Sequence, residues 1–295
     1  MTEDSSELFR VAHQAMATEF EILFPANCGV AIDKLDGLAE AVFHELDLLE
    51  DELSRYRGNS DISRINRLQP GQVARVGMAT FDCLALARAV FDETGGAFDI
   101  SIGPLMAAYR TKEGTPLYPD KVTLDLARER TGNHVYELHP EDLSITCLGE
   151  GMSLDLGGVG KGYALDQMAE TLREWGIENA LLNAGESTVL AIGCPPGETE
   201  GWPVRAEGAP DGEIFLTGFA ALSGSGFLQR GAHIMDPRKG KPVKPKARRT
   251  WALAPTAAMS DALSTAFSVM KKREIRELNA RHDGIIRSFI AEAEG

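Results

Sequence analysis

The sequence predicts a protein of mixed helices and strands, folded as two lobes that share a cleft. Its 295 residues exceed the roughly 100–150 of a common domain, yet one two-lobed unit over residues 1–295 remains within reach. Runs with the alternating pattern of strands and runs with the helical spacing of apolar residues follow one another in mixed order. Near the middle, residues 153–175 join both patterns through a glycine-rich turn, which we take as the centre of the fold.

The N-terminal third predicts a strand followed by helices. Residues 18–24 alternate in strand fashion, and residues 35–53 place apolar side chains at helical spacing with acidic residues between them. Ser60, with Ser63 three residues later, suits the N-cap of a short helix, and contact with a ligand is the alternative. Residues 79–94 predict another helix, which ends at a pair of glycines.

Asp99 stands in the middle of a strand-like apolar run over residues 97–105. An unpaired carboxylate inside such a run would be costly. Asp99 therefore either accepts backbone hydrogen bonds or faces a ligand, and the spacing does not decide between the two.

The remaining elements continue the mixed pattern. Expected helices cover residues 121–131, 161–175 and 256–271, and a charged helix and a terminal strand follow. Expected strands cover residues 135–138, 143–146, 180–186, 188–193, 214–217 and 219–222. Residues 223–226, SGSG, predict a loop with many hydroxyls and little side-chain bulk.

The glycine turn begins where an expected strand, residues 154–156, stops at Gly157, and the next helix starts near Lys161. Glycines let the backbone approach a ligand closely, and the free N–H groups of a helix's first turn favour a negative charge. A phosphate-bearing ligand is the natural candidate, and a plain structural turn is the alternative. Neither standard nucleotide fingerprint fits, because Asp155 stands where a P-loop needs glycine and Tyr163 where the dinucleotide motif has its third glycine.

The helix over residues 256–271 carries an unusual polar stripe, formed by Asp261, Ser264, Thr265 and Ser268 opposite its apolar face. A solvent-facing stripe usually carries Lys, Glu and Arg, whereas this one has a single carboxylate and three short hydroxyl side chains. Asp261 and Thr265, at positions i and i+4, could present three oxygens to one hard cation such as Mg²⁺. We therefore expect a metal site that meets the glycine turn across the cleft.

Two features near residue 240 also bear on chemistry. His233 brackets a turn with Asp236 and Arg238, a combination suited to acid–base and phosphate work, although a lone histidine is more often structural. The basic segment 239–249 is either a solvated loop or a landing site for an anionic ligand or partner.

Composition narrows the classes of function. A formal charge of −14 argues against unspecific binding to nucleic acid or acidic membranes. The four cysteines are far apart, so neither a C-x-x-C redox pair nor a zinc knuckle can be drawn. No apolar run reaches the roughly 18 residues of a membrane span. The acidic, polar first residues lack the features of a secretion signal, so we expect a cytoplasmic protein, provided that Met1 is the native start.

Together these segments resemble one family, the ApbE-like flavin transferases, also called FAD:protein FMN transferases. The resemblance runs from about residue 16 nearly to the C-terminus. It rests on seven ordered stretches, which are LSRY with SDISRIN, TGGAFDISIGPL, LDLGGVGKGYALD, LLNAGE, LSGSG, HIMDPRKGKP and SDALSTA. Seven matches in the family's order are far more specific than any one of them.

The resemblance implies an α+β, T-fold-like architecture with mixed or antiparallel sheets and flanking helices around the cleft. It also implies an enzyme that uses Mg²⁺, takes FAD as substrate, attaches FMN through a phosphoester to a Thr or Ser of an acceptor flavoprotein, and releases AMP. The implied metal ligands are Asp261, Thr265 and the carbonyl of Gly158, and the implied catalytic residues are His233 and Asp261. The implied FAD contacts are Tyr56, Ala97, Phe98, Asp99, Asp155 and Lys161.

Three positions depart from the family pattern, because Glu186, Ser225 and Lys239 replace a usual glycine, acid and threonine. They cluster where the acceptor or the nucleotide would lie, so they bear on transfer efficiency and target choice more than on binding of FAD or Mg²⁺. Two alternatives stay open. One is a Mg²⁺-dependent FAD pyrophosphatase that passes FMN to water, and the other is a flavin-binding protein without turnover.

Overall fold

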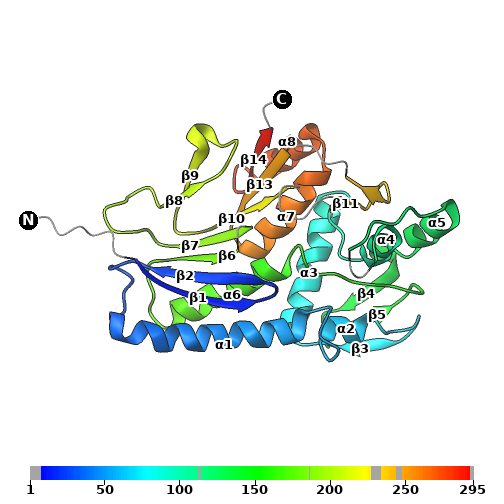
Figure 1. Cartoon of the computed structure of the whole chain (residues 1–295), viewed down its shortest axis with the longest axis horizontal. Helices are drawn as coiled ribbons and strands as arrows, with labels where there is room; N and C mark the ends of the chain where they lie inside the picture. Colours follow the sequence, from blue (N-terminus) through cyan, green and yellow to red (C-terminus); the bar gives the residue numbers. More distant parts are fainter. Residues whose placement is uncertain (1–7, 112–113, 186, 227–233, 244–247, 293–295) are drawn as a thin grey trace, which may run out of the picture.

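An antiparallel sheet forms the centre of the computed structural model, which describes residues 8–111, 114–185, 187–226, 234–243 and 248–292 (Figure 1). Its strands run in the order β1-β2-β6-β7-β10-β13-β14, and every neighbouring pair is antiparallel. Their bounds are β1 Phe9–Ala15, β2 Thr18–Phe24, β6 Ala180–Ala184, β7 Thr188–Ile192, β10 Phe219–Ser225, β13 Arg248–Ala254 and β14 Arg287–Glu292. The predicted α+β class with antiparallel sheets is confirmed.

Three helices cover one face of this sheet. They are α1 Leu35–Leu53, α6 Gly160–Glu174 and α7 Ala257–Val269. Helix α6 packs against β6 and β7, α7 packs against β10 and β13, and α1 lies along α6 and β1 (Figure 1). Alternate strand residues such as Phe20, Ile22 and Leu182 point to these helices and are fully buried with them.

The opposite face of the sheet is covered in part by a hairpin of β8 Trp202–Arg205 and β9 Glu213–Leu216. Trp202 and Ile214 of the hairpin pack with Trp251 of β13 in a separate core. The sheet is therefore sandwiched between helices and a hairpin along β7, β10, β13 and β14, and this fixes its register.

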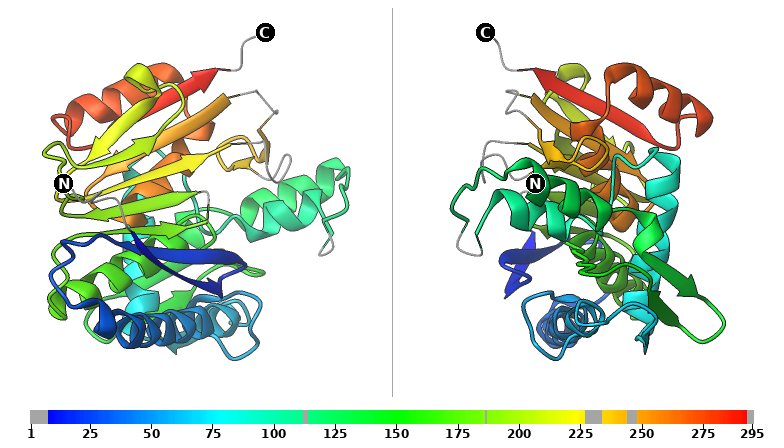
Figure 2. Two further views of the ribbon diagram at one scale, coloured as in Figure 1. Left: turned by 60° about the vertical axis from the view of Figure 1, so that its left-hand side comes forward. Right: turned by 90° about the vertical axis from the view of Figure 1, so that its right-hand side faces the viewer.

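A second group of elements packs beside the sheet, around α3 Met78–Glu93. It includes α2 Asp61–Ile65 and the small sheet β3-β5-β4, formed by Val73–Arg75, Ser144–Cys147 and Tyr136–His139. Helices α4 Gly103–Tyr109 and α5 Lys121–Glu129 project from this group (left view of Figure 2). Leu84, Ile100, Leu156 and Phe267 share one core, so the segments before α4 and before the glycine turn both pack near α7.

Short elements complete the chain. Strands β11 Met235–Asp236 and β12 Lys241–Pro242 form a small hairpin, and α8 Lys272–Arg281 precedes the edge strand β14. None of the helices in the described ranges is long and apolar enough to cross a membrane.

The prediction of a strand over residues 154–156 is wrong, because this segment makes isolated hydrogen bonds and does not pair with a neighbouring strand. The backbone N–H of Asp155 donates to the carbonyl of Ile100 at 2.7 Å. Leu154 bonds at both its N–H and its carbonyl to the side chain of Asn66, at 2.6 and 3.0 Å. A side chain and a turn satisfy the backbone here, so the segment is buried without being a strand.

The strand-like run over residues 97–105 also forms no strand. Its last three residues are the start of α4, which begins at Gly103 with Pro104 in the first turn. Proline suits that position because the first helical N–H has no intrahelical partner. The apolar composition of this run indicates that the segment is buried, but it does not indicate that the segment pairs as a strand.

The prediction of a loop over residues 223–226 is also wrong, because β10 continues through Ser225. Ser223, Gly224 and Ser225 pair with β13. Gly224 lies against the ring of Trp251, where an added Cβ would approach Cε3 to 2.6 Å. The glycine is thus required by close packing across the strand pair, and not by a turn.

Candidate active site

The glycine turn and the last long helix meet at a close crossing of α6 and α7. A Cβ added at Gly162 would stand 2.5 Å from the carbonyl carbon of Ala257 and 2.7 Å from Cα of Ala258. No side chain fits between two backbones at that distance, so only glycine allows the approach. The two segments that the sequence assigns to one site are therefore brought together.

Asp261 lies at this crossing and faces the start of α6. Its residue is 4 % exposed. Its Oδ2 lies 3.5 Å from the ammonium of Lys161 and 3.4 Å from the backbone nitrogen of Gly162. Lys161 also donates to the carbonyl of Gly157 at 3.1 Å. A buried carboxylate normally requires short, strong partners, and the long contacts of Asp261 leave it able to take a cation.

Thr265 and Gly158 complete this group, which we call the Asp261 cluster: Gly158, Lys161, Asp261 and Thr265. An added Cβ at Gly158 would lie 3.3 Å from Oγ1 of Thr265 and 3.0 Å from the ring of Phe98. The hydroxyl of Thr265 donates to the carbonyl of Asp261 at 3.3 Å. A carboxylate, a hydroxyl and a nearby peptide thus converge where the glycine leaves space.

The oxygen donors of this cluster fit a hard cation. Within the described ranges, no three His, Cys, Asp or Glu side chains gather as a metal cage. Mg²⁺ does not need such a cage, because it keeps several waters and binds through one or two carboxylates plus substrate phosphates. Asp261, Thr265 and the carbonyl of Gly158 therefore fit the predicted Mg²⁺ ligands in chemical type.

The other two residues of the α7 stripe, Ser264 and Ser268, serve packing. Ser264 is fully buried and its Oγ lies 2.8 Å from Oγ of Ser225. Ser268 lies 2.7 Å from the hydroxyl of Thr250. Short hydroxyls satisfy one another where α7 crosses β10 and β13. Ser225 also lies 3.5 Å from Thr265, so this departure from the family pattern borders the cluster.

Asp155, a predicted FAD contact, is engaged by the protein itself. Its Oδ2 accepts from Arg55 at 2.5 Å, and its Oδ1 accepts from the backbone N–H of Gly157 at 2.8 Å. The carboxylate thereby shapes the glycine turn and ties it to the end of α1. The side chain is 17 % exposed. Its direct contact with FAD stays a prediction.

Asp99 accepts a backbone hydrogen bond, which is one of the two alternatives that the sequence left open. Its Oδ1 accepts from the backbone N–H and from the hydroxyl of Ser101, at 2.8 and 2.7 Å. Burial raises the pKa of Asp99, and these hydrogen bonds oppose the rise. Ala97 and Phe98 are 1 % and 4 % exposed with their side chains in the core. These two residues would therefore contact FAD mainly through their backbone.

Tyr56 is the predicted FAD contact that stands free of the core. Its residue is 85 % exposed, and the guanidinium of Arg55 lies 5.1 Å from its ring centroid. An exposed aromatic ring next to a cation suits stacking on a flavin or adenine ring. Because Arg55 also holds Asp155, this platform is joined to the glycine turn.

Replacing Tyr56 with alanine should raise KM for FAD about fivefold, the scale of one aromatic contact. The melting temperature should stay within about 1 °C, because an exposed side chain contributes little to folding. Steady-state kinetics and a thermal melt measure both. Tyr118, which is 95 % exposed in the segment between α4 and α5, provides the control, since Tyr118→Ala should leave KM unchanged. An equal rise in both variants would contradict the assignment.

His233 and Glu186 lie outside the described residues, so the role of His233 stays a prediction. The turn that follows is held by Asp236, which is 3 % exposed and pairs with Arg238 and Lys239. Ser60 caps α2 by accepting from the N–H of Ser63 at 3.0 Å, as one of its two options predicted.

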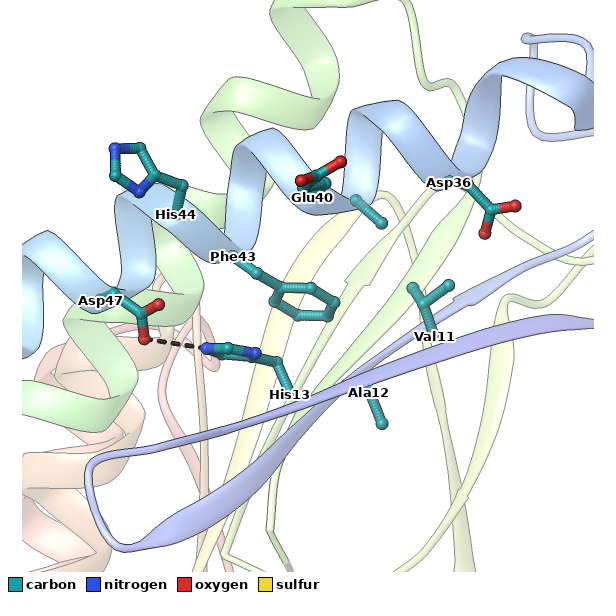
Figure 3. Close-up of a pocket in the computed structure, with 9 residues that line it drawn as sticks. Val11, Ala12, His13, Asp36, Glu40, Phe43, His44 and Asp47 are labelled. Atoms are coloured by element: carbon teal, nitrogen blue, oxygen red, sulfur yellow. Dashed lines mark hydrogen bonds and ion pairs between the residues drawn. The ribbon is translucent and has the colours of Figure 1, made fainter.

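A hollow of about 480 Å³ between β1 and α1 was not predicted from the sequence (Figure 3). His13 stacks on Phe43 there, with ring centroids 5.1 Å apart, and its Nε2 lies 2.8 Å from Oδ1 of Asp47. Asp36 and Glu40 also line it. It shares no residue with the Asp261 cluster, and its carboxylates make it a poor site for phosphates.

Sequence reasoning missed two contributors to the site. Arg55 was part of a family stretch but had no assigned role, and its partner Asp155 is 100 positions away. Gly162 belongs to the glycine-rich stretch LDLGGVGKGYALD without a role of its own there, whereas in the structure it allows the close crossing of α6 with α7. A glycine inside a helical pattern was the available signal for the second, because glycine there is costly without a packing reason.

Comparison with known proteins finds relatives that match most of the chain. Among curated proteins, the FAD:protein FMN transferase of Klebsiella pneumoniae is 25 % identical over 284 residues, which cover 90 % of this chain and 81 % of that protein. The Escherichia coli protein of the same name is 25 % identical over 276 residues, which cover 87 % of this chain and 77 % of its own.

Solved structures show the same fold. The apo flavinyl transferase ApbE of Pseudomonas stutzeri aligns with a TM-score of 0.82 at 24 % identity, covering 98 % of this chain and 92 % of that one. The ApbE protein of Thermotoga maritima aligns with a TM-score of 0.80 at 24 % identity, covering 98 % and 97 %. The sequence profile of the ApbE family matches residues 16–290. Since that match spans nearly the whole chain, this protein belongs to the ApbE family.

Proposed function

We propose that this protein is a Mg²⁺-dependent FAD:protein FMN transferase that attaches FMN to a Thr or Ser of an acceptor flavoprotein and releases AMP. The observation that carries the proposal is the convergence of Lys161, Asp261 and Thr265 at the glycine turn, in a chain of the ApbE family. A lysine and a helix N-terminus at one point suit a diphosphate, and the carboxylate beside them would hold the Mg²⁺ that binds it.

The reaction would break the bond between the FMN phosphorus and the oxygen that bridges it to AMP. A new bond would form between that phosphorus and the acceptor hydroxyl, whose proton passes to a base, the role we propose for His233. Mg²⁺, when bound by Asp261, Thr265 and the carbonyl of Gly158, would neutralise charge on the diphosphate. Lys161 would add a second positive charge at the same place.

FAD would be held by segments that the structure ties to the cluster. Tyr56 offers a stacking surface, Phe98 lies against Gly158, and Asp155 fixes the turn. Residues 1–295 would act as a single domain, because α7 contributes to two cores at once, Ala257 to one and Phe267 to the other.

The test is incubation with FAD, Mg²⁺ and a flavoprotein that carries a Thr or Ser flavinylation site, followed by a denaturing gel viewed under ultraviolet light. A fluorescent acceptor band supports transfer. Free FMN and AMP without a labelled band would mean hydrolysis of FAD, and intact FAD would mean binding alone. An acceptor with its hydroxyl residue changed to alanine is the matched control and should stay dark.

A further inference from the structure

The crossing of α6 and α7 is secured by a carboxylate that lies outside the Asp261 cluster. Asp166 of α6 accepts two hydrogen bonds from the start of α7. Its Oδ1 bonds the N–H of Ala257 at 2.7 Å, and its Oδ2 bonds the N–H of Ala258 at 2.9 Å. These N–H groups belong to the first helical turn, where no intrahelical acceptor exists. One side chain thus joins the body of one helix to the end of the other.

Helix α7 already has a cap of its own. The hydroxyl of Thr256 accepts from the N–H of Met259 at 3.2 Å, which is the usual N-cap bond. A cap from the helix's own N-cap residue does not fix where the helix lies in the fold. A cap from a side chain on another helix does. The bidentate bond from Asp166 therefore sets the position of α7 along α6, which Thr256 cannot do.

Burial of the Asp166 carboxylate costs solvation free energy. Burial raises the pKa of Asp166 to about 6, and the two backbone hydrogen bonds oppose the rise. Helix ends at a surface are satisfied by water at no such cost. An acidic group in this position indicates a requirement for a fixed geometry at the crossing.

The geometry fixed by Asp166 reaches the Asp261 cluster through one helical turn on each side. On α6, Asp166 lies four residues after Gly162, whose backbone nitrogen faces Asp261. On α7, Ala257 lies four residues before Asp261. Because each helical turn is rigid at about 5.4 Å per turn, a shift at Asp166 displaces Asp261 relative to Lys161.

We propose that Asp166 is a positioning residue, which holds α7 against α6 so that Asp261 and Thr265 face Lys161 and Gly158. Its effect on catalysis rests on the proposed function, but its effect on the crossing does not. Asp166 acts through Asp261 and contacts neither FAD nor the acceptor in this assignment.

Hydrogen exchange by mass spectrometry, on the whole chain without ligand, tests the proposal. In Asp166→Asn, one oxygen acceptor becomes an NH₂ group that opposes a backbone N–H. Exchange should become at least tenfold faster both at the start of α7, residues 257–261, and over the glycine turn and the start of α6, residues 157–162. In the control Thr256→Ala, which removes only the local cap, faster exchange should stay within α7. Asp166→Ala, which introduces no opposed donor, should repeat the two-helix pattern if Asp166→Asn folds poorly.

Kinetics provide the second readout. Asp166→Asn should lower kcat for FAD cleavage about tenfold with KM for FAD within twofold, whereas Thr256→Ala should keep both within twofold of wild type. If faster exchange in both Asp166 variants is confined to α7, Asp166 is only a cap and the proposal is overturned. Failure of the proposed function would show itself differently, as absent turnover in the wild-type protein, and the exchange pattern would still decide the role of Asp166.

Discussion

On the proposed function, replacing Asp261 with asparagine should lower Mg²⁺-dependent FAD cleavage roughly a thousandfold, which corresponds to about 4 kcal/mol of transition-state stabilisation. The amide keeps the shape of the side chain but removes the only carboxylate that contacts Lys161 among the described residues of the cluster. Neutral amides bind Mg²⁺ weakly compared with carboxylates. Release of AMP from FAD, measured over a range of Mg²⁺ concentrations, checks the prediction.

The matched control lies on the same stripe of the same helix. Ser268→Ala removes a hydroxyl that contacts Thr250 and not the cluster, so AMP release should stay within about twofold of wild type. The protein should lose about 1 kcal/mol of folding stability, as expected for one hydrogen bond. Turnover of Asp261→Asn at the wild-type rate, with unchanged Mg²⁺ dependence, would rule out Asp261 as the metal ligand.

Replacing Gly162 with alanine should destabilise the fold by about 2–3 kcal/mol, in the range of overpacked cores. The added Cβ would meet backbone atoms of Ala257 and Ala258 at 2.5 and 2.7 Å, and backbone cannot move aside as a flexible side chain can. The melting temperature should fall by roughly 4–12 °C. Separation of the helices would also move Asp261 from Lys161, so FAD cleavage should fall with it.

The sign of this effect is diagnostic, because alanine is the better helix former by about 1 kcal/mol. Gly37 in α1 provides the comparison, since an added Cβ there has no neighbour within 4 Å. Gly37→Ala should raise the melting temperature slightly or leave it unchanged. If Gly162→Ala behaves like Gly37→Ala, then α6 and α7 are not in the close contact described above.

Much of the local structure is readable from the sequence. The predicted helix over residues 35–53 is α1 with the same bounds, and the predicted helix over residues 256–271 contains α7 with Thr256 as its cap. Periodicity of apolar residues and capping chemistry act over a few neighbouring positions, so they can be read without the fold. The family is also readable, because seven ordered stretches are retained.

The sequence alone was wrong where burial and strand pairing look alike. Residues 154–156 and 97–105 are apolar but form no strand, and Ser223–Ser225 lack bulk but belong to β10. Strand pairing depends on which distant segment lies alongside, and composition reports only that a segment is buried.

The sequence by itself determined the family, the α+β class, and the two segments that carry Lys161 and Asp261. Only the tertiary structure decided how their neighbours are used. In the structure, Asp155 pairs with Arg55, and Asp166 of α6 binds the start of α7. Ser264 and Ser268 bond to hydroxyls of the neighbouring strands. The physical reason is that helix and turn signals lie within one short segment, whereas the partner of a buried polar group is chosen by packing between segments that are far apart in the chain.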